Sequence, residues 1–256
     1  MKLAQNDFKT RYAGSYFGVV WAMVQPVVIV LVYWFVFQIG LNNATAELKQ
    51  GITVPFVLWL VSGIVPWFYF SESLSNGTNA LLEYNYLVKK VVFNISVLPV
   101  VKIISALFVH GFFVLLAIIL YICNGRFPDW YYLQILYYSA CVFFLVLGLC
   151  YATSAIAVLF RDLNQIIGIG LQVGVWLTPI MWVSESMIGT NSLLYKILQL
   201  NPVFYIVSGY RDAFIIKRWF FERPVWTLYF WVFAICCFLF GNWIFKRLRV
   251  HFADVL

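Results

Sequence analysis

The sequence predicts an all-α polytopic membrane protein with six transmembrane helices in one domain of residues 1–256. Hydrophobic residues make up 64% of the chain and charged residues only 11%, against about 25% charged in soluble domains. Crossing about 30 Å of hydrocarbon takes about 20 apolar residues in a helix. Runs of that kind cover residues 19–39, 53–71, 97–123, 133–160, 163–183 and 225–245.

Residues 1–18, before the first span, predict an interfacial helix. Apolar side chains recur every four residues and form one stripe, with Lys9 and Arg11 flanking it. The stripe consists of Ala4, Phe8, Tyr12 and Tyr16. Such a helix lies with its apolar face in lipid and its basic groups toward anionic headgroups. It either only anchors the first span or also forms a lateral surface where lipid enters.

The distribution of Lys and Arg predicts the orientation. An even number of spans places both termini on the same side of the membrane. That side also holds most of the Lys and Arg residues that lie outside segment 184–224. The positive-inside rule then makes both termini cytoplasmic. The net charge of +7 follows from this topology and from attraction to anionic lipid, so it requires no nucleic-acid partner.

Segment 72–96, between the second and third spans, predicts a short helix on the cytoplasmic surface. Asn76-Gly77 is a turn signal, after which apolar residues alternate with polar ones at helical spacing. The apolar face consists of Leu81, Leu82, Leu87 and Val88, and the polar residues are Glu83, Asn85, Lys89 and Lys90. This helix is either a connection held by lipid headgroups or a docking element for a soluble partner.

The inner turn between the fourth and fifth spans contains Arg161-Asp162. A basic residue here tethers the turn to the cytoplasmic side. The alternative is that the pair bonds across helices near an inner gate, as polar groups at membrane depth often do. The residues favour neither interpretation.

Segment 184–224 predicts a helical hairpin that dips back into the outer face. Asn201-Pro202 must break its helical pattern, because the residue before proline is pushed out of the α region. The following run, 203–216, is too short for a span and contains Arg211-Asp212, which should face water or the protein interior. A hairpin that opens and closes should be held by modest contacts rather than by deep packing.

The sequence contains little that predicts catalysis. It has no Gly-x-x-x-x-Gly-Lys phosphate loop, so the chain itself should not hydrolyse ATP. It also has no carboxylate pair within a span and no acidic cluster that would hold a metal. His110, midway along the third span, should form an interhelical hydrogen bond. The five cysteines should pack as small hydrophobic residues.

Four sequence blocks together resemble one protein family. They read DFKTRYAGSYFGVVWAMVQP, LVKKVVFNISVLP, LFRDLNQIIGIGLQVGVWLTPIMW and NPVFYIVSGYRDAFI. In order and spacing they are similar to the membrane subunits of type-2 ABC exporters of lipid-linked polysaccharide, such as O-antigen and teichoic-acid permeases. The resemblance runs from about residue 5 to 245. The family often has proline after the aromatic residue of the second block, where this chain reads Phe93-Asn94.

The resemblance implies a homodimer in the cytoplasmic membrane of a bacterium, exporting undecaprenyl-type lipid-linked polysaccharide. It implies two copies of a separate ATPase, which bind the ATP and Mg that this chain does not hold as a cofactor. It places the ATPase joint at residues 80–93, the lipid entrance at the interfacial helix, and the outer gate in the hairpin. The implied joint comprises Leu82, Glu83, Tyr84, Asn85, Leu87, Lys89 and Lys90, the entrance Phe8, Lys9, Arg11, Tyr12 and Tyr16, and the gate Tyr205, Tyr210, Arg211 and Asp212.

Aromatic residues make up 20% of the chain, which suits a carbohydrate cargo because flat aromatic faces pack on sugar rings. Those deep in the predicted spans are candidates for lining the channel: Trp21, Tyr33, Trp34, Phe37, Trp59 and Trp176. A type-2 ABC exporter of a drug or small lipid would share the topology. A membrane transferase acting on lipid-linked sugars would share the aromatic content, but it needs a metal or acid–base cluster that the sequence lacks.

Overall fold

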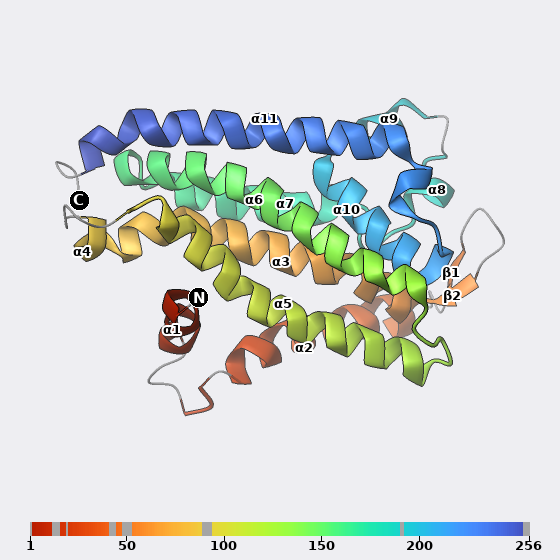
Figure 1. Cartoon of the computed structure of the whole chain (residues 1–256). Coiled ribbons are helices and arrows are strands. Elements are labelled where there is room, and N and C mark those ends of the chain that lie inside the picture. Colours follow the sequence, from red (N-terminus) through yellow and green to blue (C-terminus); the bar gives the residue numbers. More distant parts are fainter. Residues whose placement is uncertain are drawn as a thin grey trace.

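The computed structural model describes residues 2–11, 16–18, 20–40, 45–47, 53–88, 94–189 and 192–252. Most of these residues are helical, which confirms the prediction of a mainly α-helical chain. A short antiparallel pair, β1 (Thr45–Glu47) and β2 (Thr53–Pro55), was not predicted. It lies just before the second long helix, at one end of the bundle (Figure 1).

Five helices of the described chain are long and apolar enough to cross a membrane. They comprise α2 (Val20–Trp34) with the π-helical turn Phe35–Gly40, α3 (Phe56–Glu83), α5 (Val97–Cys123), the turn Trp130–Leu133 with α6 (Gln134–Leu159), and α11 (Pro224–Leu248) with its terminal turn. Their positions agree with five of the six predicted spans. The sixth predicted span contains only α7 (Leu163–Leu177), which is shorter.

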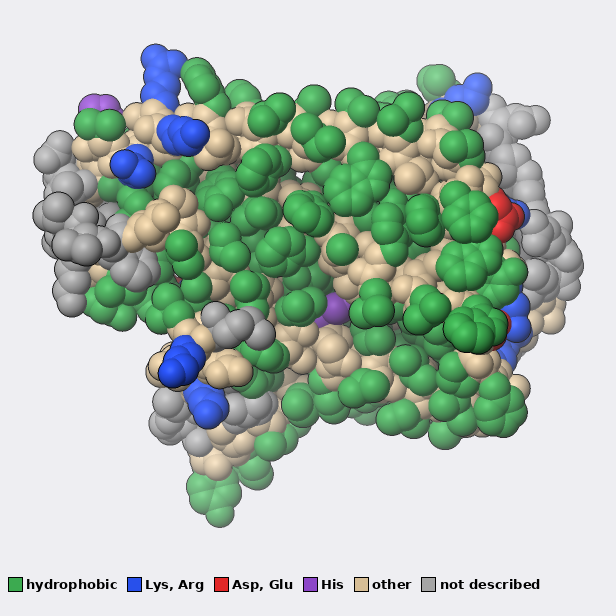
Figure 2. Space-filling view, in the orientation of Figure 1, with side chains coloured by type: hydrophobic (Ala, Val, Ile, Leu, Met, Phe, Trp, Pro, Cys, Tyr) green, Lys and Arg blue, Asp and Glu red, His purple; other side chains and the backbone are tan. Residues whose placement is uncertain are grey.

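The long helix α3 forms the centre of the bundle and packs against α5, α6 and α10 (Pro202–Arg211). The helices α1 (Lys2–Arg11) and α4 (Asn85–Val88) lie toward the end where the chain terminates. The short helices α8 (Ser184–Met187) and α9 (Leu193–Gln199) lie at the opposite end (Figure 1). Figure 2 shows hydrophobic side chains covering the middle of one face, with Lys and Arg toward its two ends.

The predicted turn at Asn76-Gly77 is wrong, because both residues lie inside α3. A Cβ atom on Gly77 would come within 2.3 Å of Cys150 Sγ. Glycine therefore serves here to bring α3 and α6 together, and this packing outweighs the local turn preference. The predicted surface helix after this turn is reduced to α4, which follows α3 almost directly.

The fifth predicted span ends earlier than expected, at Leu177 rather than at residue 183. Thr178 adopts extended backbone angles (φ −81°, ψ 124°) because Pro179 follows it. At 1.5 Å per residue, α7 is about 22 Å long, which is less than the thickness of the hydrocarbon layer.

Candidate functional sites at the two ends of the bundle

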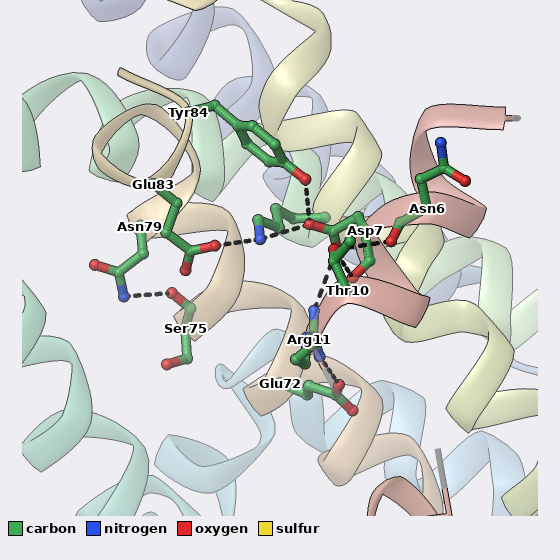
Figure 3. Close-up of polar contacts among 10 residues, drawn as sticks. Asn6, Asp7, Thr10, Arg11, Glu72, Ser75, Asn79, Glu83 and Tyr84 are labelled. Carbon is green, nitrogen blue, oxygen red and sulfur yellow. Dashed lines mark hydrogen bonds and ion pairs between the residues drawn. The ribbon is translucent and has the colours of Figure 1, made fainter. Parts of the chain in front are cut away.

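At the end that holds α1, the first helix packs on α5 through a buried carboxylate. Asp7 is only 4% exposed, and its Oδ1 accepts a hydrogen bond of 2.7 Å from Lys102 Nζ and one of 2.6 Å from the Tyr84 hydroxyl. Lys102 lies in α5 and is also 4% exposed. Because Tyr84 directly follows α3, the carboxylate of Asp7 joins three elements at one point (Figure 3).

Three more ion pairs surround this contact. Lys102 also pairs with Glu83, the last residue of α3. Arg11 Nη1 contacts Glu72 Oε1 of α3 at 2.5 Å and lies 3.5 Å from Asp7 Oδ2 through its other nitrogen. We call these five charged residues and Tyr84 the α1 network. It ties α1 to the part of α3 that leads into α4.

The surroundings of Asp7 keep it ionised. Burial by itself would raise the pKa of its carboxyl, but hydrogen bonds from Lys102 and Tyr84 and the charge of Lys102 outweigh burial and lower the pKa below 3.8. A depressed folded-state pKa contributes stability above the unfolded value, and this contribution is lost as the pH falls through the folded value. At neutral pH the Asp7 carboxylate is therefore ionised and contributes to stability.

The predicted apolar stripe of the interfacial helix requires two corrections. Helix α1 ends at Arg11, so Tyr16 does not continue its face and lies 97% exposed in a separate turn. The face that carries Ala4 and Asp7 packs on protein rather than on lipid. Phe8 contacts Phe108 of α5, with ring centroids 5.8 Å apart. Asp7 was not part of the predicted stripe. It lies three residues after Ala4, on the same face of the helix, and anchors α1 there.

At the opposite end, a cavity of about 500 Å³ lies among α3, α9, α10 and the start of α11. Its described lining carries four cationic side chains and one carboxylate, along with several aromatic rings. We call it the α10 pocket. The cations are Lys196, Arg211, Arg218 and Arg223, the carboxylate is Asp212, and the aromatic residues are Trp59, Tyr195, Phe204, Tyr205 and Trp226.

Arg211 is held rigidly in the wall of this pocket. Its guanidinium lies 3.5 Å from the ring centre of Trp59, and its Nη2 donates a hydrogen bond of 2.8 Å to the Ile180 carbonyl. A Cβ atom on Gly63 would come within 3.0 Å of the same nitrogen, so glycine leaves the room for it. Asp212 pairs with Arg223 at 3.0 Å. Both residues of Arg211-Asp212 are thus buried in protein, as the argument from membrane depth requires.

Helix α10 begins where the sequence predicted a break. The Asn201 side chain accepts a hydrogen bond from Val203 N, and Pro202 occupies the first turn. The expectation of shallow packing is wrong, however, because most of α10 is buried. Tyr210 is 0% exposed, and its hydroxyl lies 3.0 Å from His110 Nε2. His110 therefore makes the predicted interhelical hydrogen bond. Small residues allow this depth: a Cβ on Gly209 would fall 2.1 Å from the Tyr138 ring.

Helix α7 is the least covered of the apolar helices. None of its residues is buried, and all of them are described. Gln165 and Gln172 are exposed and lie seven residues apart, on the same face as the exposed Gly168, Ile169 and Trp176. Exposed amides in an apolar helix are costly against lipid, so this face is suited to a polar path or to a partner helix. Neither glutamine was predicted as a site residue, although their seven-residue spacing is visible in the sequence.

The chain matches the family described as ABC-2 type transporter over residues 1–215. It belongs to that family. The membership confirms the family resemblance read from four sequence blocks. It also confirms the prediction of a transport subunit rather than an enzyme, and with the membrane-length helices it makes the chain an integral membrane protein.

Relatives of this ABC-2 transporter chain include proteins named for polysaccharide export. An O-antigen export system permease protein RfbA of Myxococcus xanthus is 29% identical over 219 residues, covering 85% of this chain and 80% of that protein. An RfbA of the same description from Klebsiella pneumoniae is 25% identical over 262 residues, covering 99% and 93%. The polysialic acid transport protein KpsM of Escherichia coli is 21% identical over 216 residues, covering 81% and 78%.

The residues expected to form the ATPase joint of this ABC-2 chain divide into two groups. Glu83 and Tyr84 belong to the α1 network, while Asn85 is exposed and Leu82 and Leu87 are half-buried. Tyr86, which was not singled out, is 55% exposed beside them. Lys89, Lys90 and Tyr12 lie outside the described residues. Lys9 is exposed on α1.

The other predicted site residues of this ABC-2 chain lie apart from one another. Arg161 and Asp162 are exposed in the turn between α6 and α7. Trp21 and Trp176 are exposed, Tyr33, Trp34 and Phe37 are half-buried, and Phe37 stacks on Phe56. Trp59 is different, because it is buried in the wall of the α10 pocket. The structure brings together Trp59, Tyr205, Arg211 and Asp212, which the sequence analysis had assigned to two separate features.

Proposed function

We propose that this chain is the permease subunit of an ABC exporter that moves undecaprenyl-type lipid-linked polysaccharide across the bacterial cytoplasmic membrane. The observation that carries this proposal is the exposed face of α7 with Gln165, Gln172 and Trp176. Amides and an aromatic ring on one helix suit passing sugar hydroxyls and ring faces. The relatives named for O-antigen and polysialic acid transport support the same cargo class.

The topology that this function needs has six crossings, with α7 and the turn after it as the short fifth crossing. Both termini are then cytoplasmic, and the α10 pocket lies at the outer face, with α9 and α10 as a re-entrant hairpin. Two copies of the chain form the transporter, with α7 and α2 facing each other across the path. The low burial of both helices in the single chain supports this arrangement.

A separate ATPase, in two copies, supplies the energy and binds the ATP and Mg. Its docking element is α4, where Asn85 and Tyr86 are exposed immediately beyond the α1 network. Because Glu83 and Tyr84 bond to Lys102 and Asp7, a movement of α4 is passed directly to α1 at the lipid entrance. Arg161-Asp162 forms the inner gate. The outer gate lies at Tyr205, Tyr210, Arg211 and Asp212, and because these residues are buried it opens by a movement of α10 as a whole.

Deleting the gene in its native host should leave lipid-linked polysaccharide inside the cell and remove it from the surface. The wild-type chain should restore surface polysaccharide, whereas a Gln165→Leu/Gln172→Leu variant should restore less than about a tenth, because the path loses its amides. Antibody or lectin staining of whole and lysed cells measures both pools. The matched Gln165→Asn/Gln172→Asn variant keeps the amides and should export. If the deletion strain keeps normal surface polysaccharide, the assignment of polysaccharide as the cargo is rejected, and export of a drug or small lipid is favoured.

A further inference from the structure

The α10 pocket carries more positive charge than the proposed outer gate requires. Two of its cations are already engaged, since Arg223 pairs with Asp212 and Arg211 stacks on Trp59. Lys196 and Arg218 add positive charge, and neither has an acidic partner among the described side chains. The wall is therefore positive beyond what its own carboxylate neutralises, which favours an anionic ligand.

The chain backbone aims Arg218 into this pocket and its neighbour away from it. Lys217 adopts a left-handed conformation (φ 61°) and pairs at 2.7 Å with Asp129 outside the pocket. The buried Gln134 then donates a hydrogen bond of 2.8 Å to the Arg218 carbonyl and accepts one of 2.8 Å from Phe220 N. The turn thus separates two adjacent cations, and only Arg218 lines the pocket.

Most of the polar groups in the wall are hydrogen-bond donors. The Trp59 indole N–H is buried and has no hydrogen-bond acceptor among the described residues. Lys and Arg side chains donate and cannot accept, and phosphate oxygens are the acceptors that they bind most readily. A volume of about 500 Å³ holds a phosphate or pyrophosphate group together with an attached sugar. The Tyr195 and Trp226 rings in the wall suit the sugar.

The outer surface of α9 places the pocket at the level of lipid headgroups. Leu193, Leu194 and Ile197 are 74%, 60% and 52% exposed on this helix, while Tyr195 and Lys196 line the pocket. A helix with one apolar exposed side and one basic side lies in the membrane interface. A ligand reaching the pocket from the lipid would present its headgroup first.

We propose that the α10 pocket is a binding site for the phosphate-bearing headgroup of a membrane lipid. The proposal that the pocket lies at the outer face, where it would receive a headgroup after transport, rests on the proposed function. The phosphate chemistry is shared by an isoprenoid pyrophosphate and by an anionic phospholipid. Lys196 and Arg218 bind the phosphate oxygens, and Arg211 and Trp59 form another part of the wall.

The test uses the full chain alone in a phosphate-free detergent, because a bound ATPase would itself bind phosphate compounds and a phospholipid bilayer would supply competing headgroups. Inorganic pyrophosphate should bind saturably and raise the melting temperature. Lys196→Gln/Arg218→Gln should weaken this binding by about tenfold or more, since two charge-assisted contacts are lost. The matched control is Lys217→Gln, which removes an adjacent cation outside the pocket and should leave binding unchanged. Absence of saturable binding, or equal weakening by the control, would overturn the proposal.

Competition then identifies the source of the headgroup. Undecaprenyl pyrophosphate that displaces inorganic pyrophosphate assigns the pocket to an isoprenoid lipid, and phosphatidylglycerol that displaces it assigns the pocket to a phospholipid. Displacement by neither rejects a lipid headgroup. A failure of this proposal can be distinguished from a failure of the proposed function. The proposed function is tested by surface polysaccharide in the deletion strain, whereas pyrophosphate binding is measured on the purified chain without transport.

Discussion

Replacing Lys102 with Met is expected to destabilise the chain by about 3–5 kcal/mol, because one partner of a buried ion pair is removed. Asp7 is 4% exposed and would be left in the protein interior without the ammonium that now lies 2.7 Å away. Glu83 would also lose its partner, but its half-exposed side chain remains hydrated. Thermal unfolding in detergent should show a large loss of stability, and export should fall because α1 is held less firmly against α3 and α5.

A double-mutant cycle separates the ion pair from simple loss of packing. Asp7→Asn on the Lys102→Met background removes the stranded charge and should recover part of the lost stability. Lys9→Met is the matched control, since Lys9 is exposed on the same helix, and it should change stability by less than about 0.5 kcal/mol. Additive effects of the two network substitutions, or a loss no larger than that of Lys9→Met, would show that the network does not hold α1.

Gly241→Ala is expected to separate α6 from α11. A Cβ atom on Gly241 would lie 2.0 Å from the Gly148 carbonyl oxygen, and one on Gly148 would lie 2.6 Å from Phe238 N. Both obstacles are backbone atoms, so a rotamer change cannot relieve the overlap and the helices must move apart. Overpacking of this kind costs about 1–3 kcal/mol or more, and the melting temperature in detergent should fall accordingly.

Gly168→Ala on α7 is the matched control for that substitution. No atom lies within 4 Å of a Cβ built there, so alanine should be neutral or stabilising by up to about 1 kcal/mol through helix propensity. Equal losses from Gly241→Ala and Gly168→Ala would mean that the close approach of α6 and α11 does not determine stability.

The sequence predicted the elements that depend on local physics. Hydrophobic length located five membrane-length helices, with 97–123 correct at both ends. The rule for residues before proline placed the start of α10 after Asn201 and also explains why α7 stops at Leu177. The prediction that His110 forms a hydrogen bond between helices likewise needed no tertiary information.

The elements that failed depend on contacts between distant residues. Asn76-Gly77 by itself predicts a turn. Only the close contact between Gly77 of α3 and Cys150 of α6 explains why glycine lies inside a helix here. Asp7 was not predicted to have a role, because its partner Lys102 is 95 residues away. Trp59 and Arg211 lie on separate predicted elements, and nothing in their spacing indicates that they stack at 3.5 Å. Periodicity identifies faces of helices but not what covers them.

The most direct test of the proposed function is reconstitution of this chain with its ATPase partner in proteoliposomes that contain lipid-linked polysaccharide. On ATP addition, we predict that polysaccharide crosses to the side opposite the ATPase, where an added glycosidase degrades it, and that Gln165→Leu/Gln172→Leu abolishes this transfer. ATP hydrolysis by the reconstituted complex without any transfer of polysaccharide would contradict the assignment of this chain as a polysaccharide permease.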